Sequence, residues 1–421
     1  MKQKTIIITS IFIVSAGIQL ISQVIVTRLF GASLEMANFL VAVTVPTMLV
    51  TVIYATLNDA FLPLYGEKLD SKDKGIKYFS SVVYGLGLIS WVVAMAGSLW
   101  SVQIVKLLFG QSQSFQLDVA SKQLSYMIYC LPLAVIATLL GSWWYAHKHF
   151  LRFPVAQLVG TVTNLGIIVL LYPVWGIWAL VSAFVINLVF QIAWVWVKVR
   201  PRWSWLNIKG ILLAWWPLIV GSIAMRSDML LIRVFGAQLG GGYLVYLNLL
   251  AKIFSISASL ITVGIQVLLL PHLVEHFSQK KYQSADKLIG KAKLVSLLLS
   301  IGVSLSIWWL SPAIIRILFV GGKFNIEDFH KTISLLPVFV LPGVGWGISS
   351  VFFQPLLALK KQLAVGVISV VSLIGGWWST SYFLHQGLGT RSLAIGLSVL
   401  LFGAIAGSEI IWQKERRKLL N

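Results

Sequence analysis

Three charged residues lie inside apolar stretches that are long enough to cross a membrane. Arg226 and Asp228 stand two positions apart in the run 211–232, and Lys252 lies well inside the run 242–270. A charge in hydrocarbon costs several kcal/mol and is usually retained for function. Because Lys252 is too deep to reach the interface easily, we expect it to face a water-filled cavity or a counter-charge.

These residues suggest a binding site rather than a catalytic one. We expect Arg226 and Lys252 to bind substrate, and Asp228 and Asp59 to act in ion coupling or gating. Arg226 and Asp228 could instead form a local structural pair, although positions i and i+2 do not share a helix face. Asp59 follows Asn58 near the predicted cytoplasmic end of its span, where a residue that caps the helix end is the alternative.

The composition requires a membrane protein. Of 421 residues, 58% are hydrophobic and only 11% are charged, whereas soluble domains carry about 25% charged residues. The net charge of +20 would suit a nucleic-acid binder, but most Lys and Arg fall in alternate loops, which is typical of membrane topology. We therefore expect no nucleic-acid partner. The only cysteine, Cys130, excludes an intramolecular disulfide.

Hydropathy predicts twelve spans with both termini in the cytoplasm, where the basic loops gather. Prolines and glycines are expected to interrupt the second, fourth, seventh and tenth spans. The cytoplasmic loops include the basic turn Lys360–Lys361. The predicted spans are 5–26, 36–57, 78–100, 124–146, 155–172, 177–197, 211–232, 242–270, 294–310, 333–359, 363–384 and 392–412.

The second half of the chain repeats the first. The stretch 26–32, with Arg28 before Leu-Phe-Gly-Ala, matches the stretch 231–237, with Arg233 before Val-Phe-Gly-Ala, and both are predicted to lie at outer helix ends. A second match, 104–109 against 314–319, follows in the same order. The repeat predicts an all-α membrane protein with two pseudo-symmetric six-helix halves, residues 1–205 and 206–421, around a central cavity.

Several motifs resemble the MurJ/MviN family of lipid II flippases. They are Arg28-Leu-Phe-Gly-Ala-Ser, Asn38-Phe-Leu-Val-Ala with Pro46, Ala60-Phe-Leu-Pro63, the stretch Tyr246–Lys252 followed by Gly264–Pro271, and Gly321-Gly-Lys-Phe324. The family belongs to a superfamily that also holds polysaccharide flippases and multidrug extrusion antiporters. The resemblance implies that Lys252 takes the place of an arginine in the eighth helix, whereas Ala16, Ser22 and Val50 stand where the family has cavity arginines. The chain also ends without the two extra C-terminal helices typical of the family.

The resemblance implies a flippase that moves a polyprenyl-diphosphate-linked glycan or peptidoglycan precursor across the bacterial cytoplasmic membrane by alternating access. Its partners would be that substrate and membrane lipids, and the protein would be a monomer. We expect no cofactor or metal, because no nucleotide or zinc motif is visible; a proton, a sodium ion or the membrane potential would supply the energy. The alternatives are a cation-coupled multidrug extrusion antiporter and a membrane glycan ligase or polymerase.

Overall fold

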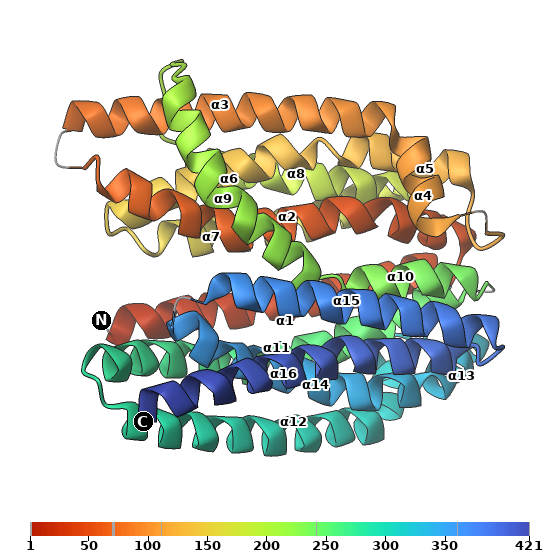
Figure 1. The fold of residues 1–421 in the computed structure, drawn as a ribbon. Helices are drawn as coiled ribbons and strands as arrows, with labels where there is room; N and C mark the ends of the chain where they lie inside the picture. The colour runs from red at the N-terminus through yellow and green to blue at the C-terminus, as the bar shows by residue number, and fades with distance from the viewer. Residues whose placement is uncertain (1, 70–71, 111, 241, 360, 421) are drawn as a thin grey trace. The chain divides into compact units, whose positions relative to one another are not determined.

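The computed structural model describes residues 2–69, 72–110, 112–240, 242–359 and 361–420, which form helices α1 to α16 (Figure 1). Contacts group these helices into two compact units, Met1–Ile223 and Ala224–Asn421. Backbone groups in a bilayer must bond within their own segment, so apolar runs of this length fold as helices. Lys360 and most side chains of 264–271 lie outside the described part.

The first unit has one helix at its centre. Helix α6 packs against α2, α3 and α8, while α7 pairs with α8 and α1 packs on α7. The bounds are α1 Lys2–Phe30, α2 Leu34–Gly66, α3 Lys72–Leu99, α4 Ser101–Phe109, α5 Leu117–Met127, α6 Cys130–Ala146, α7 Arg152–Trp175, α8 Trp178–Trp194 and α9 Trp205–Met225.

The second unit repeats this pairing. Helix α14 is central and packs against α11, α12 and α16, while α15 pairs with α16. The bounds are α10 Asp228–Gln238, α11 Tyr243–Ser278, α12 Tyr282–Leu318, α13 Ile326–Ser334, α14 Leu336–Ala358, α15 Gln362–His385 and α16 Thr390–Leu420. Since α14 stands in the second unit where α6 stands in the first, the pairing agrees with the repeat read in the sequence.

The predicted fold class is confirmed. Ten helical segments in the described part are long and apolar enough to span a membrane, and two shorter apolar helices, Trp178–Trp194 and Tyr243–Ile256, accompany them. One detail of the span prediction is wrong. Helix α2 continues through Pro46 and α14 continues through Pro342, so these prolines do not interrupt their helices. The fourth and seventh spans are interrupted as expected, at Ile128–Tyr129 and Arg226–Ser227, and a turn at Leu335 separates α13 from α14 near the start of the tenth span. None of these breaks falls at a proline.

Helix α9 packs with the first unit, although it opens the second repeat in the sequence. Its Trp215 Nε1 donates a hydrogen bond of 2.8 Å to Thr56 Oγ1 on α2, and its Asn207 Nδ2 donates one of 2.9 Å to Ser81 Oγ on α3. Figure 1 shows α9 crossing the other helices of this unit obliquely. The division at residues 205 and 206 rests on the repeat and stays a prediction.

Glycine allows α15 and α16 to approach closely. A Cβ atom on Gly396 would lie 1.6 Å from Thr380 Oγ1 and 2.8 Å from the backbone oxygen of Gly376. Because a backbone atom cannot move aside easily, we expect Gly396→Ala to destabilise the protein by about 1–3 kcal/mol. Thermal unfolding in detergent measures this. Gly302→Ala on α12 is the matched control, since its Cβ would meet nothing within 4 Å; an equal loss in both variants would contradict the packing account.

Candidate functional site

The predicted seventh span, 211–232, is broken at the charged residues. Helix α9 ends at Met225 and α10 begins at Asp228, so the seventh span is interrupted as expected, although not at its proline Pro217. Arg226 follows the C-terminal end of one helix, and Asp228 lies in the first turn of the next. Both charges have the sign that the adjacent helix dipole favours. Arg226 is exposed, Asp228 is partly buried, and their charges attract each other.

Asp228 is positioned by the central helix of its unit. Trp346 Nε1 on α14 donates a hydrogen bond of 2.7 Å to Asp228 Oδ2. The Trp346 ring stacks on Phe339, with ring centroids 6.2 Å apart, and Phe339 stacks on Phe254 of α11 at 5.9 Å. The carboxylate is therefore linked through an aromatic column to α11, the helix that carries Lys252.

A buried cation, Arg233, bonds to the residue that lies one helical turn before Lys252. The side chain of Arg233 is only 4% exposed, and its Nε donates a hydrogen bond of 3.0 Å to Asn248 Oδ1. Asn248 is itself buried and lies one helical turn before Lys252 on α11. Arg233 is close enough for its charge to act on the Lys252 ammonium. Arg233, Asn248 and Lys252 are called the cation cluster below.

The carboxylates of the second unit each have a hydrogen-bond or ion-pair partner. Asp228 bonds to Trp346, and the other pairs are Asp328 with Tyr246, Glu327 with Lys331, Asp286 with Arg416, Glu409 with Lys293, Glu415 with Lys361, and Glu275 with Gln279. The charge of Arg233 acts on Lys252. Such a cluster favours an anion, and a positive pair of this kind would repel a cationic drug.

Sequence reasoning found Lys252 but missed its companions. It placed Arg233 at an outer helix end, whereas the residue lies in the middle of α10. The available signal was spacing on α11: Asn248 and Lys252 are four residues apart, so they share a helix face. A polar residue at i−4 from a lysine inside an apolar run indicated a polar site there.

The first unit holds the other two predicted residues. Arg28 is exposed in the last turn of α1, and Asp59 is exposed on α2. Helix α2 begins at Leu34, so at about 1.5 Å per residue Asp59 lies roughly 37 Å along the helix from the end near Arg28. The structure therefore does not bring these two residues together.

Removal of the Asn248 acceptor tests how the cation cluster is held. In Asn248→Leu the side chain keeps its approximate volume, but the Arg233 guanidinium loses a buried acceptor. We expect the free energy of unfolding to fall by about 1–3 kcal/mol, measured by thermal unfolding in detergent. Leu250→Met is the control, because a volume-conserving apolar swap at a buried position of the same helix is well tolerated. Equal unfolding temperatures for Asn248→Leu and the native chain would contradict this role of Asn248.

Two repeated helix bundles with charged residues inside the spans define a multi-pass membrane transporter. The family model described as lipid II flippase MurJ matches residues 26–419. The chain belongs to the MurJ family of lipid II flippases. This family is one of transporters, so the expectation that the chain is not an enzyme is confirmed.

The solved structures that resemble this chain show its fold. A lipid II flippase MurJ in an inward closed conformation superposes with a TM-score of 0.85, at 18% identity, over 98% of this chain and 90% of that chain. A multidrug resistance MATE family transporter in an inward-facing conformation gives 0.75, at 12% identity, over 96% and 95%. At these identities the likeness concerns architecture alone.

Curated relatives match over large parts of the chain. A probable lipid II flippase MurJ of Buchnera aphidicola is 21% identical over 78% of this chain and 67% of its own length, and one of Borreliella burgdorferi is 21% identical over 88% and 76%. For a third, from Rhizobium tropici, the match covers 68% of this chain and 57% of the relative. The matches thus cover between 57% and 76% of the length of these three relatives.

Proposed function

We propose that this protein flips a polyprenyl-diphosphate-linked peptidoglycan precursor, lipid II or a close relative, across the bacterial cytoplasmic membrane. Membership of the MurJ family supports the substrate class. The cation cluster is the observation that assigns the proposed function to particular residues. In this cluster Arg233 bonds to Asn248, and the charge of Arg233 acts on Lys252. A diphosphate is the part of such a substrate that two adjacent cations would bind.

The mechanism follows from where the charge lies. The lipid tail can remain in the bilayer, while the diphosphate and sugars need a polar path through the protein. Lys252 and Arg233 would hold the diphosphate in that path, and Arg226 at the helix break would offer a further, exposed cation. Alternating access of the two units would then release the head group on the other side.

The remaining features of the proposal rest on the sequence. Both termini lie in the cytoplasm, because the basic loops gather on that side. The protein acts as a monomer without a cofactor, and a proton, a sodium ion or the membrane potential drives transport. Asp228 and Asp59 are the candidate coupling or gating carboxylates.

Transport in liposomes tests the function. The purified protein is reconstituted with fluorescent lipid II, and the labelled head groups that an impermeant quencher reaches are followed with time. We expect quenching to proceed beyond the outer leaflet only when the protein is present. A fluorescent organic cation loaded in parallel liposomes tests the antiporter alternative. Movement of the cation without movement of lipid II would overturn the proposal.

A further inference from the structure

The turn between α11 and α12 contains a residue in an unusual conformation. Helix α11 ends at Ser278 and α12 begins at Tyr282. Between them, Lys280 has a φ angle of 56°, the left-handed region that favours glycine. The backbone bonds from Lys280 N to Phe277 O and from Lys281 N to His276 O close this turn. A lysine therefore occupies a position where glycine would be less strained.

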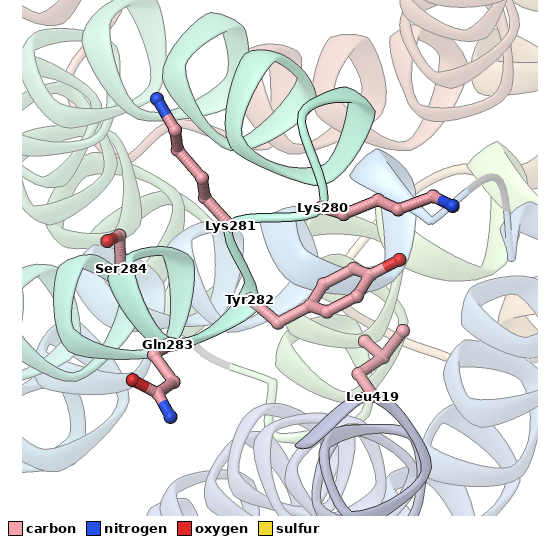
Figure 2. Close-up of a pocket in the computed structure, with 6 residues that line it drawn as sticks. All are labelled: Lys280, Lys281, Tyr282, Gln283, Ser284 and Leu419. Carbon is pink, nitrogen blue, oxygen red and sulfur yellow. The ribbon is translucent and has the colours of Figure 1, made fainter. Parts of the chain in front are cut away.

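The turn borders a hollow on the surface of the second unit. The hollow has a volume of about 410 Å³ and is lined by Lys280, Lys281, Tyr282, Gln283, Ser284 and Leu419. We call it the turn pocket. Figure 2 shows the Lys280 ammonium and the Tyr282 hydroxyl pointing toward the same side of the turn, next to Leu419, while Lys281 extends to the other side. Its size falls within the range of small-molecule sites, roughly 300–1,000 Å³.

The end of α16 is held against this turn. Arg416 Nη2 donates a hydrogen bond of 2.8 Å to Asp286 Oδ2 on the first turns of α12. This ion pair places Leu419, one turn further along α16, beside Tyr282. It also neutralises Asp286, the acidic residue nearest in sequence to the pocket.

The polar groups of the turn pocket suit a phosphate. The Lys280 ammonium and the Tyr282 hydroxyl lie on the same side of the turn, and none of the six lining residues carries a carboxylate. Nearby acidic residues already have partners, since Asp286 pairs with Arg416, and Glu415 pairs with Lys361 and Lys418. Lysine is a common point-charge ligand for phosphate groups, and the hydroxyl of Tyr282 can donate to a further oxygen.

The length of α12 places the pocket where two kinds of phosphate are available. The helix has 37 residues and is thus about 55 Å long, while a bilayer with its head groups is about 40–45 Å thick. The turn therefore lies at the head-group layer or just beyond it. Under the proposed topology this is the cytoplasmic side, where both phospholipid head groups and soluble phosphates can reach Lys280.

We propose that the turn pocket is a second anion site, separate from the cation cluster, and that it binds a phosphate-bearing ligand through the Lys280 ammonium and the Tyr282 hydroxyl. Leu419 and the Tyr282 ring form its apolar wall. The site goes beyond the flipping function, because none of its residues belongs to the cation cluster. The strained backbone at Lys280 also allows a variant that removes the ligand group without damage to the fold.

Titration of the purified full-length protein in detergent tests the proposal. The probes are short-chain phosphatidic acid and inorganic phosphate, each followed by calorimetry. Lys280→Gly removes the ammonium group and relaxes the turn, so we expect its thermal stability to be equal or higher and its dissociation constant to rise at least tenfold. Lys287→Gln removes the same charge from an exposed position on the same helix hairpin, outside the pocket, and should change the constant less than about twofold.

The binding results distinguish the possible ligands of the turn pocket from one another and from the absence of a site. Tighter binding of phosphatidic acid than of phosphate, lost in Lys280→Gly, supports the site and identifies a lipid head group as its ligand. Equal binding of both probes with the same loss supports the site and identifies a soluble phosphate. Submillimolar binding of neither probe overturns the proposal, as does an equal loss in Lys280→Gly and Lys287→Gln. None of these results depends on whether lipid II is the transported substrate.

Discussion

Lys252→Gln is expected to reduce flipping of lipid II by about thirtyfold or more. Glutamine keeps most of the length of the side chain and can still donate hydrogen bonds, but it removes the charge that would hold a diphosphate. Loss of one partner from a buried, hydrogen-bonded charge pair costs about 2 kcal/mol or more, which corresponds to about thirtyfold. The rate of quenching of fluorescent lipid II in proteoliposomes measures the effect.

The chemistry of the replacement separates binding from structure. Lys252→Arg keeps the charge and adds a planar fork that can bind phosphate oxygens in pairs, so we expect flipping at or above the native rate. Lys291→Gln removes a cation from an exposed position on α12 and should leave the rate within about twofold. Arg233→Gln should slow flipping as Lys252→Gln does, because Arg233 lies beside Lys252. Normal rates in both cluster variants would remove the cation cluster from the mechanism.

Hydropathy and the repeat were enough to predict most of the architecture. Hydropathy predicted twelve spans because twenty apolar residues in a row have few other stable structures. Ten helical segments of the described part are long and apolar enough to span a membrane, and two shorter apolar helices accompany them. The repeat around Arg28 and Arg233 revealed two halves, and the two units show the same helix pairing around α6 and α14. Hydropathy and the repeat are both read over long stretches of sequence, so a single unusual residue changes neither prediction.

Local interruptions were harder to predict for the same reason. A hydropathy window over 211–232 averages across Arg226, Ser227 and Asp228 and reports one span, although Ser and Asp are preferred at helix starts. Prolines were expected to break α2 and α14, yet both helices continue, because neighbouring groups can satisfy the freed backbone groups in a membrane. The structure was needed to show which interruption is real.

The candidate site was predicted only in part. Lys252 was identified because a lone cation in an apolar run is conspicuous. The burial of Arg233 depends on how α10 packs against α11, and no periodicity in an eleven-residue helix reports that contact. The partner of Asp228 was equally hidden, since Trp346 is 118 positions away in the sequence.

Asp228→Asn is expected to leave the protein folded and to reduce the dependence of flipping on an imposed ion gradient or membrane potential. Asparagine keeps an oxygen that can accept the hydrogen bond from Trp346 Nε1 and remains a favourable residue at a helix start. What it loses is the negative charge and the ability to take up a proton. We therefore expect an unfolding temperature close to the native value, with a flipping rate that changes less than threefold between energised and non-energised liposomes.

Asp228→Ala distinguishes coupling from structural support. Alanine removes the acceptor of Trp346 and the charge at the start of α10 together, so it should also lower the free energy of unfolding by about 1–3 kcal/mol. If Asp228→Asn responds to the gradient as the native chain does while Asp228→Ala loses stability, the carboxylate only anchors α10 to α14. If Asp228→Asn alone abolishes the response, the charge itself couples the gradient to transport. The bond to Trp346 then gives a physical route, because a proton or cation bound at Asp228 weakens this bond and loosens α10, which carries Arg233.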